Sequence, residues 1–96
     1  MADYNDVTKY YKCWELINRE NFLPKDQVKN KDLDKPLPIG DGQTTSQPSL
    51  ITNMLIMLLG NIEPEILQKN RIKALDIGSG SGIVTALLAC LLKPGD

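Results

Sequence analysis

The chain has 96 residues, of which 42% are hydrophobic and 24% are charged, and its formal net charge is −1. This length suits one small domain or part of a larger one, and the composition excludes an intrinsically disordered protein. A charge so close to neutrality gives no indication of a nucleic-acid partner.

No segment has the character of a secretory signal or a membrane span. Residues 1–16 carry aspartates and lack the uninterrupted apolar core of a signal peptide. The longest nearly apolar run, 83–92, is well short of the ~20 residues that cross a bilayer. Cys13 and Cys90 lack metal-ligand spacing, and the chain has no histidine to complete a metal site. We therefore expect two buried thiols in a reducing compartment, no metal, and a cytoplasmic protein.

The first predicted element is a helix over residues 7–17. Apolar side chains recur there at spacings of three and four and form one stripe, which we expect to pack onto the domain: Val7, Tyr10, Tyr11, Trp14 and Ile17. The period is lost over residues 18–21. In residues 25–35 lysines alternate with aspartates, which favours a solvated surface loop over a phosphate-binding patch.

The next segment, residues 35–48, is predicted to be irregular. Pro36, Pro38, Gly40 and Gly42 interrupt it too often for a regular helix or an internal strand. A long irregular segment of this kind is typical of a binding loop or a linker.

A second helix is predicted from Pro48 to Leu59. Proline suits the first turn of a helix because its missing N–H would be unpaired there in any case. The expected apolar face consists of Leu50, Met54, Met57 and Leu58. Gly60 and Asn61 can close the helix with a left-handed residue, and a short helical turn is expected at 63–70.

Residues 72–77, I-K-A-L-D-I, are typical of a buried parallel strand. G-S-G-S-G follows at 78–82, and a helix that is apolar almost all round is predicted over 81–92, ended by Lys93-Pro94-Gly95. This helix should be covered on several sides. Strand, glycine loop and helix form the opening of a βαβ unit, whose returning strand we expect beyond Asp96.

The glycine loop is the most informative part of the sequence. Gly78, Gly80 and Gly82 let the backbone turn sharply and let a ligand approach where a Cβ would collide. The following helix offers unpaired N–H groups to an anionic group or polar edge. A dinucleotide fingerprint would need glycine where Ile83 stands, and the G-K-[ST] of a phosphate loop is absent. Asp76 is expected to order the loop N–H groups or to face the ligand.

The loop G-x-G-x-G, preceded by L-D-I, is similar to the first motif of methyltransferases that bind S-adenosylmethionine. A site for NAD or flavin, and a turn that serves only strand-to-helix packing, remain as alternatives.

A second motif resembles one family of these enzymes. Residues 36–48 read P-L-P-I-G-D-G-Q-T-T-S-Q-P, which resembles the P-L-P-I-G-x-G-Q-T-[IT]-S-Q-P signature of the protein-L-isoaspartate O-methyltransferases. R-E-N-F-L-P at 19–24 is similar to the R-x-x-F-[VL]-P stretch that precedes this signature, and the distance from Ser46 to Asp76 also suits the family. Thr45 replaces a common isoleucine, which puts the substrate preference, more than the reaction type, in question.

The resemblance implies the N-terminal portion of an α/β, Rossmann-like methyltransferase fold: helices, the first strand, the glycine loop and the following helix. Residues 1–96 would then be a single incomplete domain with an N-terminal helical segment and loop (1–35), an active-site loop (36–48) and the start of the core (49–96). Ser46 is implied as the catalytic residue. The residues implied to bind S-adenosylmethionine are Gln43, Thr44, Thr45, Ser46, Asp76, Gly78, Ser79, Gly80, Ser81 and Gly82.

The activity implied is methyl transfer from S-adenosylmethionine to the carboxyl of L-isoaspartyl and D-aspartyl residues in damaged proteins, which initiates repair. The implied full-length enzyme is a monomer that acts on proteins or peptides and not on nucleic acid or membranes. Two alternatives remain: a truncated, inactive fragment, because the acidic residue that grips the ribose would lie beyond Asp96, or another nucleotide-binding Rossmann protein. For Ser46 alone, a helix N-cap is the competing interpretation.

Overall fold

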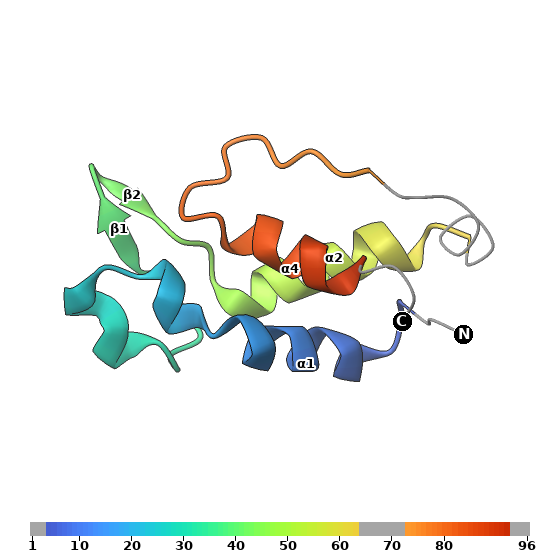
Figure 1. Cartoon of the computed structure of the whole chain (residues 1–96), viewed down its shortest axis with the longest axis horizontal. Coiled ribbons are helices and arrows are strands. Elements are labelled where there is room, and N and C mark those ends of the chain that lie inside the picture. The colour runs from blue at the N-terminus through green and yellow to red at the C-terminus, as the bar shows by residue number, and fades with distance from the viewer. Residues whose placement is uncertain (1–3, 64–72, 93–96) are drawn as a thin grey trace.

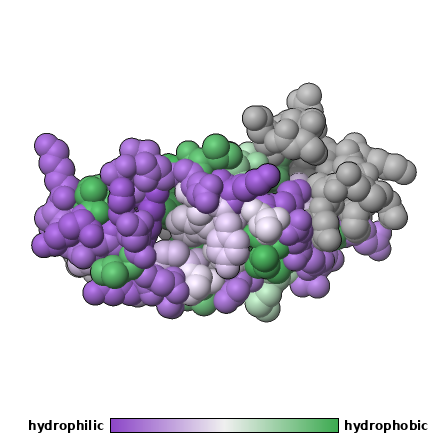
Figure 2. Space-filling model, turned by 90° about the horizontal axis from the view of Figure 1, so that it is seen from below, coloured by the Kyte–Doolittle hydropathy of each residue, from purple (hydrophilic) through white to green (hydrophobic). Residues whose placement is uncertain are grey.

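The computed structural model describes residues 4–63 and 73–92. Within these residues, helices α1 (Val7–Ile17), α2 (Pro48–Gly60) and α4 (Ile83–Leu91) pack together. Two 3-10 helices (Arg19–Phe22 and Lys25–Asn30) and a small antiparallel sheet of β1 (Pro38–Gly40) and β2 (Gln43–Thr44) occupy one end of the molecule (Figure 1). Seen from the α1 side, that end is mainly hydrophilic (Figure 2).

The helices share one hydrophobic core. Its buried members come from all three helices: Tyr10, Cys13, Ile51, Leu55, Leu59, Ile83, Leu87, Leu88 and Leu91. The predicted helix over 81–92 is confirmed as α4, which buries four large aliphatic side chains in this core. None of the helices in residues 4–63 and 73–92 is both long and apolar enough to cross a membrane. The predicted turn at 63–70, apart from its first residue, and the stop at Lys93-Pro94-Gly95 lie outside the described residues.

Helix α1 has the predicted bounds, and part of its predicted stripe faces the core. It begins after Asp6, whose carboxylate accepts the Thr8 N–H at 3.0 Å, and it ends before Asn18, which has a φ of 53°. Tyr10 and Cys13 are buried, whereas Tyr11, expected on the packed stripe, is 60% exposed, and Val7 is exposed as well. Trp14 and Ile17 pack against the core beside Tyr10, so three of the five predicted residues contribute to it.

Helix α2 also has nearly the predicted bounds, but its predicted apolar face is wrong. The residues expected in the core are all exposed: Leu50, Met54, Met57 and Leu58. The side chains that are buried instead are Ile51, Thr52, Leu55 and Leu59. A helix that is apolar nearly all round has no period that selects a face, so its neighbours decide.

The end of α2 also differs from the prediction of a left-handed residue. Asn61, which follows the helix, has a right-handed φ of −92°. Asn5 instead donates from Nδ2 to the Gly60 carbonyl at 3.4 Å. A side chain distant in sequence therefore donates to the carbonyl of the last residue of the helix, which has no partner within the helix.

The predicted parallel strand is not formed. Residues 73–77 have no regular secondary structure, and Leu75 and Ile77 are 84% and 86% exposed. A strand of this kind exists only when a neighbour completes its backbone hydrogen bonds, and no other described segment lies beside it as a strand. Residues 35–48, predicted to be irregular, do contain a short hairpin, with Pro38 opposite Thr44 and Gly40 opposite Gln43.

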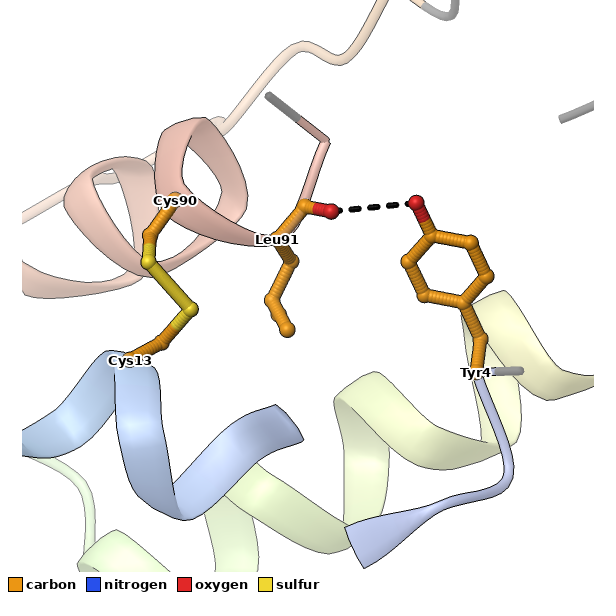
Figure 3. The surroundings of a disulfide bond; sticks show 4 residues. All are labelled: Tyr4, Cys13, Cys90 and Leu91. Carbon is orange, nitrogen blue, oxygen red and sulfur yellow. Dashed lines mark hydrogen bonds between the residues drawn. A yellow bond between two sulfur atoms is a disulfide. The ribbon is translucent and has the colours of Figure 1, made fainter. Parts of the chain in front are cut away.

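The prediction of two free thiols is wrong. Cys13 on α1 and Cys90 on α4 form a disulfide, with Cα atoms 5.9 Å apart (Figure 3). The two cysteines are 77 residues apart in sequence, so their pairing becomes evident only from the packing of the helices. The Tyr4 hydroxyl donates to the Leu91 carbonyl at 3.0 Å nearby, so two long-range interactions tie the start of the chain to α4.

Candidate functional site

The glycine loop adopts the backbone that its sequence predicts. Gly78, Gly80 and Gly82 have φ values of +71°, +57° and +87°, in the left-handed region that favours glycine. The Gly82 N–H donates to the Ser79 carbonyl at 2.9 Å, and Gly82 is the residue that precedes α4. The loop therefore leads directly into the N-terminal end of a helix, where backbone N–H groups are left without helical partners.

Asp76 contacts α4 rather than the loop amides that we expected it to order. Its Oδ2 accepts a hydrogen bond from the Thr85 hydroxyl at 2.9 Å. Thr85 lies in the first turn of the helix. The carboxylate therefore fixes how the residues before the glycine loop meet the helix after it.

The hairpin lies against the glycine loop. A Cβ built on Gly80 would lie 3.6 Å from Cδ1 of Ile39, a residue of β1. Both segments occupy the same end of the molecule (Figure 1). The structure therefore brings together the two motifs that were singled out separately in the sequence.

The residues proposed from the sequence differ in exposure. Gln43 and Thr44 form β2 and are exposed, Thr45 is buried, and Ser46 is exposed again. In the glycine loop, the glycines at 78 and 80 and Ser79 are exposed, and the residues at 81 and 82 are half-buried.

Ser46 does not cap α2. The cap position belongs to Gln47, which makes no side-chain capping hydrogen bond. Within residues 4–63 and 73–92, no hydrogen bond engages the Ser46 hydroxyl, so its donor and its acceptor face solvent. The interpretation of Ser46 as a helix cap is therefore wrong.

Arg19 is a functional candidate that residue-level reasoning missed. Its side chain is 7% exposed, and it donates to the carbonyls of Lys31 at 3.3 Å, Leu33 at 2.7 Å and Lys35 at 2.9 Å. It also donates to Oγ1 of Thr45 at 3.3 Å. Burial lowers the pKa of Arg19 from its ordinary value, and the nearby Asp34 carboxylate opposes this shift. Only its place in the R-x-x-F motif could have marked it.

We call residues 31–35 the strap; its Asp34 is the second residue that was missed. The Asp34 carboxylate accepts the Ser49 N–H at 2.8 Å, which caps the first turn of α2. Gln47 Nε2 donates to the Asp34 carbonyl at 3.1 Å and to its carboxylate at 3.3 Å. The hydrogen bonds from Ser49 hold the pKa of Asp34 below its ordinary value, with smaller contributions from Gln47 and Arg19.

Acid is expected to release the start of α2 from the strap. Because the folded pKa of Asp34 is depressed, its stabilisation is complete above the unfolded pKa of about 4 and is lost as the pH falls through the folded value. The Ser49 amide, followed by NMR during an acid titration, should therefore shift and lose protection, relative to the intrinsic exchange rate at each pH, below about pH 4.

The substitution Asp34→Asn should remove this acid step, whereas Asp32→Asn, in the same strap, should keep it. An identical step in wild type and Asp34→Asn would contradict the assignment.

A hollow of about 500 Å³ lies beside Arg19 and Asp34, which both contribute to its walls. It is bounded by α1, the strap and the start of α2, with Trp14, Lys31 and Thr52 among its lining residues. Neither Ser46 nor the glycine loop contributes to its walls, so it is not the space that the two motifs share.

Sequence comparisons identify the relatives of this chain. The sequence model of the protein-L-isoaspartate(D-aspartate) O-methyltransferase family matches residues 2–95. A protein-L-isoaspartate O-methyltransferase of Methanothermobacter thermautotrophicus is 35% identical, with 86% of this chain and 35% of the relative covered. Enzymes of the same name from Myxococcus xanthus and Alteromonas mediterranea are 42% and 47% identical over 80% and 76% of the chain, and 32% of each relative is covered.

The chain thus spans about a third of the length of these curated relatives. No solved structure matches it. The family match runs through both motifs that meet at Gly80 and Ile39. The chain belongs to the protein-L-isoaspartate(D-aspartate) O-methyltransferase family.

Proposed function

We propose that the parent protein of this chain methylates the carboxyl of L-isoaspartyl and D-aspartyl residues in damaged proteins, with S-adenosylmethionine as the donor. The observation that carries the proposal is the proximity of the hairpin leading to Ser46 and the glycine loop, since the Ile39 side chain lies on the side of Gly80 where a Cβ would stand. Family membership supplies the reaction, and this proximity supports a site built from both motifs.

The fold proposed for the parent is a Rossmann-like α/β domain, of which residues 1–96 are the incomplete first part. In it, residues 1–35 form the N-terminal helical segment and loop, 36–48 form the active-site loop, and 49–96 begin the core. Residues 73–77, in which Leu75 and Ile77 are exposed here, would then belong to the first strand of a sheet. A neighbouring strand would satisfy their backbone and cover Leu75 and Ile77.

The glycine loop fits the donor. A Cβ added to Gly78 or Gly82 would meet no atom within 4 Å, so the backbone of the loop faces open space that a ligand can occupy. We assign the contacts with the amino-acid and sugar portions to residues 78–82, with Asp76 beside them and Gln43, Thr44, Thr45 and Ser46 over the donor. When bound, S-adenosylmethionine supplies an electrophilic methyl group.

Ser46 is proposed to orient the substrate carboxylate. An isoaspartyl side chain, with a pKa near 4, is already ionised at neutral pH and needs no strong general base. Its chief requirement is a fixed position at attack distance. The exposed hydroxyl of Ser46, free of protein hydrogen bonds in the described residues, can donate to one carboxylate oxygen.

We place the parent protein in the cytoplasm as a monomer, with no nucleic-acid or membrane partner. The Cys13–Cys90 disulfide argues against this location, because a reducing compartment would keep the two thiols unpaired. Two reactive thiols in the protein isolated from the cell would support the cytoplasmic location. A second candidate function is an inactive fragment. The absence of a formed strand at 73–77 in the described structure favours it for the isolated chain.

The proposal is tested by labelled methyl transfer to an isoaspartyl peptide and to the matching aspartyl peptide. The parent protein should label only the first. Ser46→Ala should lower kcat/KM by about ten- to a hundredfold, because one hydrogen bond to a charged group is lost. Equal labelling of both peptides would refute the assignment. Micromolar donor binding by residues 1–96 alone would remove the inactive-fragment alternative.

A further inference from the structure

We propose that Arg19 is the positioning residue that holds Ser46 in place, acting through Thr45 and the strap. The inference rests on the proposed role of Ser46 but concerns a residue outside both motifs that build the site. Arg19 lies in the 3-10 helix that follows α1 and touches no group proposed to bind donor or substrate other than Thr45.

The guanidinium of Arg19 forms hydrogen bonds with both the strap and Thr45, which are separate in sequence. It has five N–H donors in a planar fork, and it uses them on the carbonyls of strap residues 31, 33 and 35 and on the Thr45 hydroxyl. All four acceptors are neutral oxygens. A lysine has three donors at one point and cannot span acceptors on both the strap and the hairpin.

Thr45, the residue directly before Ser46, is held in place by Arg19 and by Leu37. Its N–H donates to the Leu37 carbonyl at 2.8 Å, and its Oγ1 accepts the Leu37 N–H at 3.1 Å as well as the Arg19 hydrogen bond. Thr45 is therefore held by three hydrogen bonds, two at its buried side chain and one at its backbone N–H. Ser46 follows one peptide bond later.

Asp34 fixes the chain on the other side of Ser46. It lies in the strap between two carbonyls that Arg19 holds, and it binds Gln47 and the Ser49 N–H. Both flanks of Ser46 are thus anchored to elements that Arg19 organises, while the Ser46 hydroxyl itself is left free. The backbone of Ser46 is therefore fixed, and its hydroxyl remains available to a ligand.

Amide hydrogen exchange on the protein tests the positioning directly. In Arg19→Met, the amides of Thr45 and Ser49 should exchange at least about tenfold faster, because both lose their anchor, whereas the Ala86 amide in α4 should be unchanged. Arg19→Lys should give an intermediate acceleration. The matched control is Lys12→Met, which removes an exposed cation from α1 and should change neither amide.

Faster exchange that is uniform over Thr45, Ser49 and Ala86 in both Arg19 variants would overturn the inference, because it would reveal only a loss of global stability. Unchanged exchange at Thr45 and Ser49 would overturn it as well.

Methyl transfer by the parent protein provides the second readout. Arg19→Lys should lower kcat by about tenfold or more with a smaller rise in KM for the donor, since residues 78–82 keep their contacts while Thr45 and Ser46 are displaced. A higher KM at unchanged kcat would overturn the positioning role. Absence of methyl transfer in wild type would refute the proposed function instead, and the exchange result would still decide whether Arg19 organises the loop.

Discussion

Reduction of the Cys13–Cys90 disulfide should lower the free energy of unfolding by about 4 kcal/mol. The bond closes a loop with a sequence separation of 77 residues, and the chain-entropy relation gives a loss of this size for such a loop. It is a large part of the stability of a domain of this length. Urea unfolding followed by circular dichroism, with and without dithiothreitol, measures the difference.

The double variant Cys13→Ser, Cys90→Ser provides the control for this experiment. It should unfold at the midpoint of the reduced protein and should not respond to dithiothreitol. Two thiols that react with Ellman's reagent in the native, unreduced protein would contradict the disulfide itself.

The helices were predictable from the sequence, but their buried faces were not. Proline at 48 and the spacing of apolar residues predicted α2 within one residue of its observed end. Its buried face then depended on which neighbours were present, because Met54 and Leu55 are equally suitable for a core. Hydrophobic periodicity therefore located this helix without orienting it.

The predictions of a strand at 73–77 and of two unpaired thiols were wrong for a related reason. The segment 73–77 has the composition of a buried strand, yet a strand needs a hydrogen-bonding neighbour, which the described residues do not supply. Cys13 and Cys90 become neighbours only when α1 packs against α4. Both features depend on contacts that are distant in sequence, and no local pattern encodes them.

In the candidate site, the local backbone conformation was predictable from the sequence, but the long-range hydrogen bonds were not. Alternating glycines predicted the left-handed backbone at 78, 80 and 82, because that conformation is a local property. The hydrogen bonds of Arg19 and Asp34 join residues separated by up to 26 positions, and a charged side chain gives no sign in sequence of which carbonyls it will bind. The R-x-x-F resemblance included Arg19 but gave no indication of its hydrogen-bond partners.

Truncation of Leu87 should test whether the core described here is the one that stabilises the chain. Leu87 lies on α4, is 1% exposed and packs in the cluster shared by α1, α2 and α4. Leu87→Ala should cost about 2–5 kcal/mol, since it removes buried methyl groups and leaves a cavity that rigid helices fill only in part.

The identical substitution on α2, Leu58→Ala, is the matched control. Leu58 is 57% exposed, so this substitution should change the free energy of unfolding by less than about 0.5 kcal/mol. The two midpoints in a urea titration give the comparison. If Leu58→Ala cost as much as Leu87→Ala, the face of α2 that is exposed in the structure would be buried in solution. Helix α2 would then have to be rotated about its axis relative to α1 and α4.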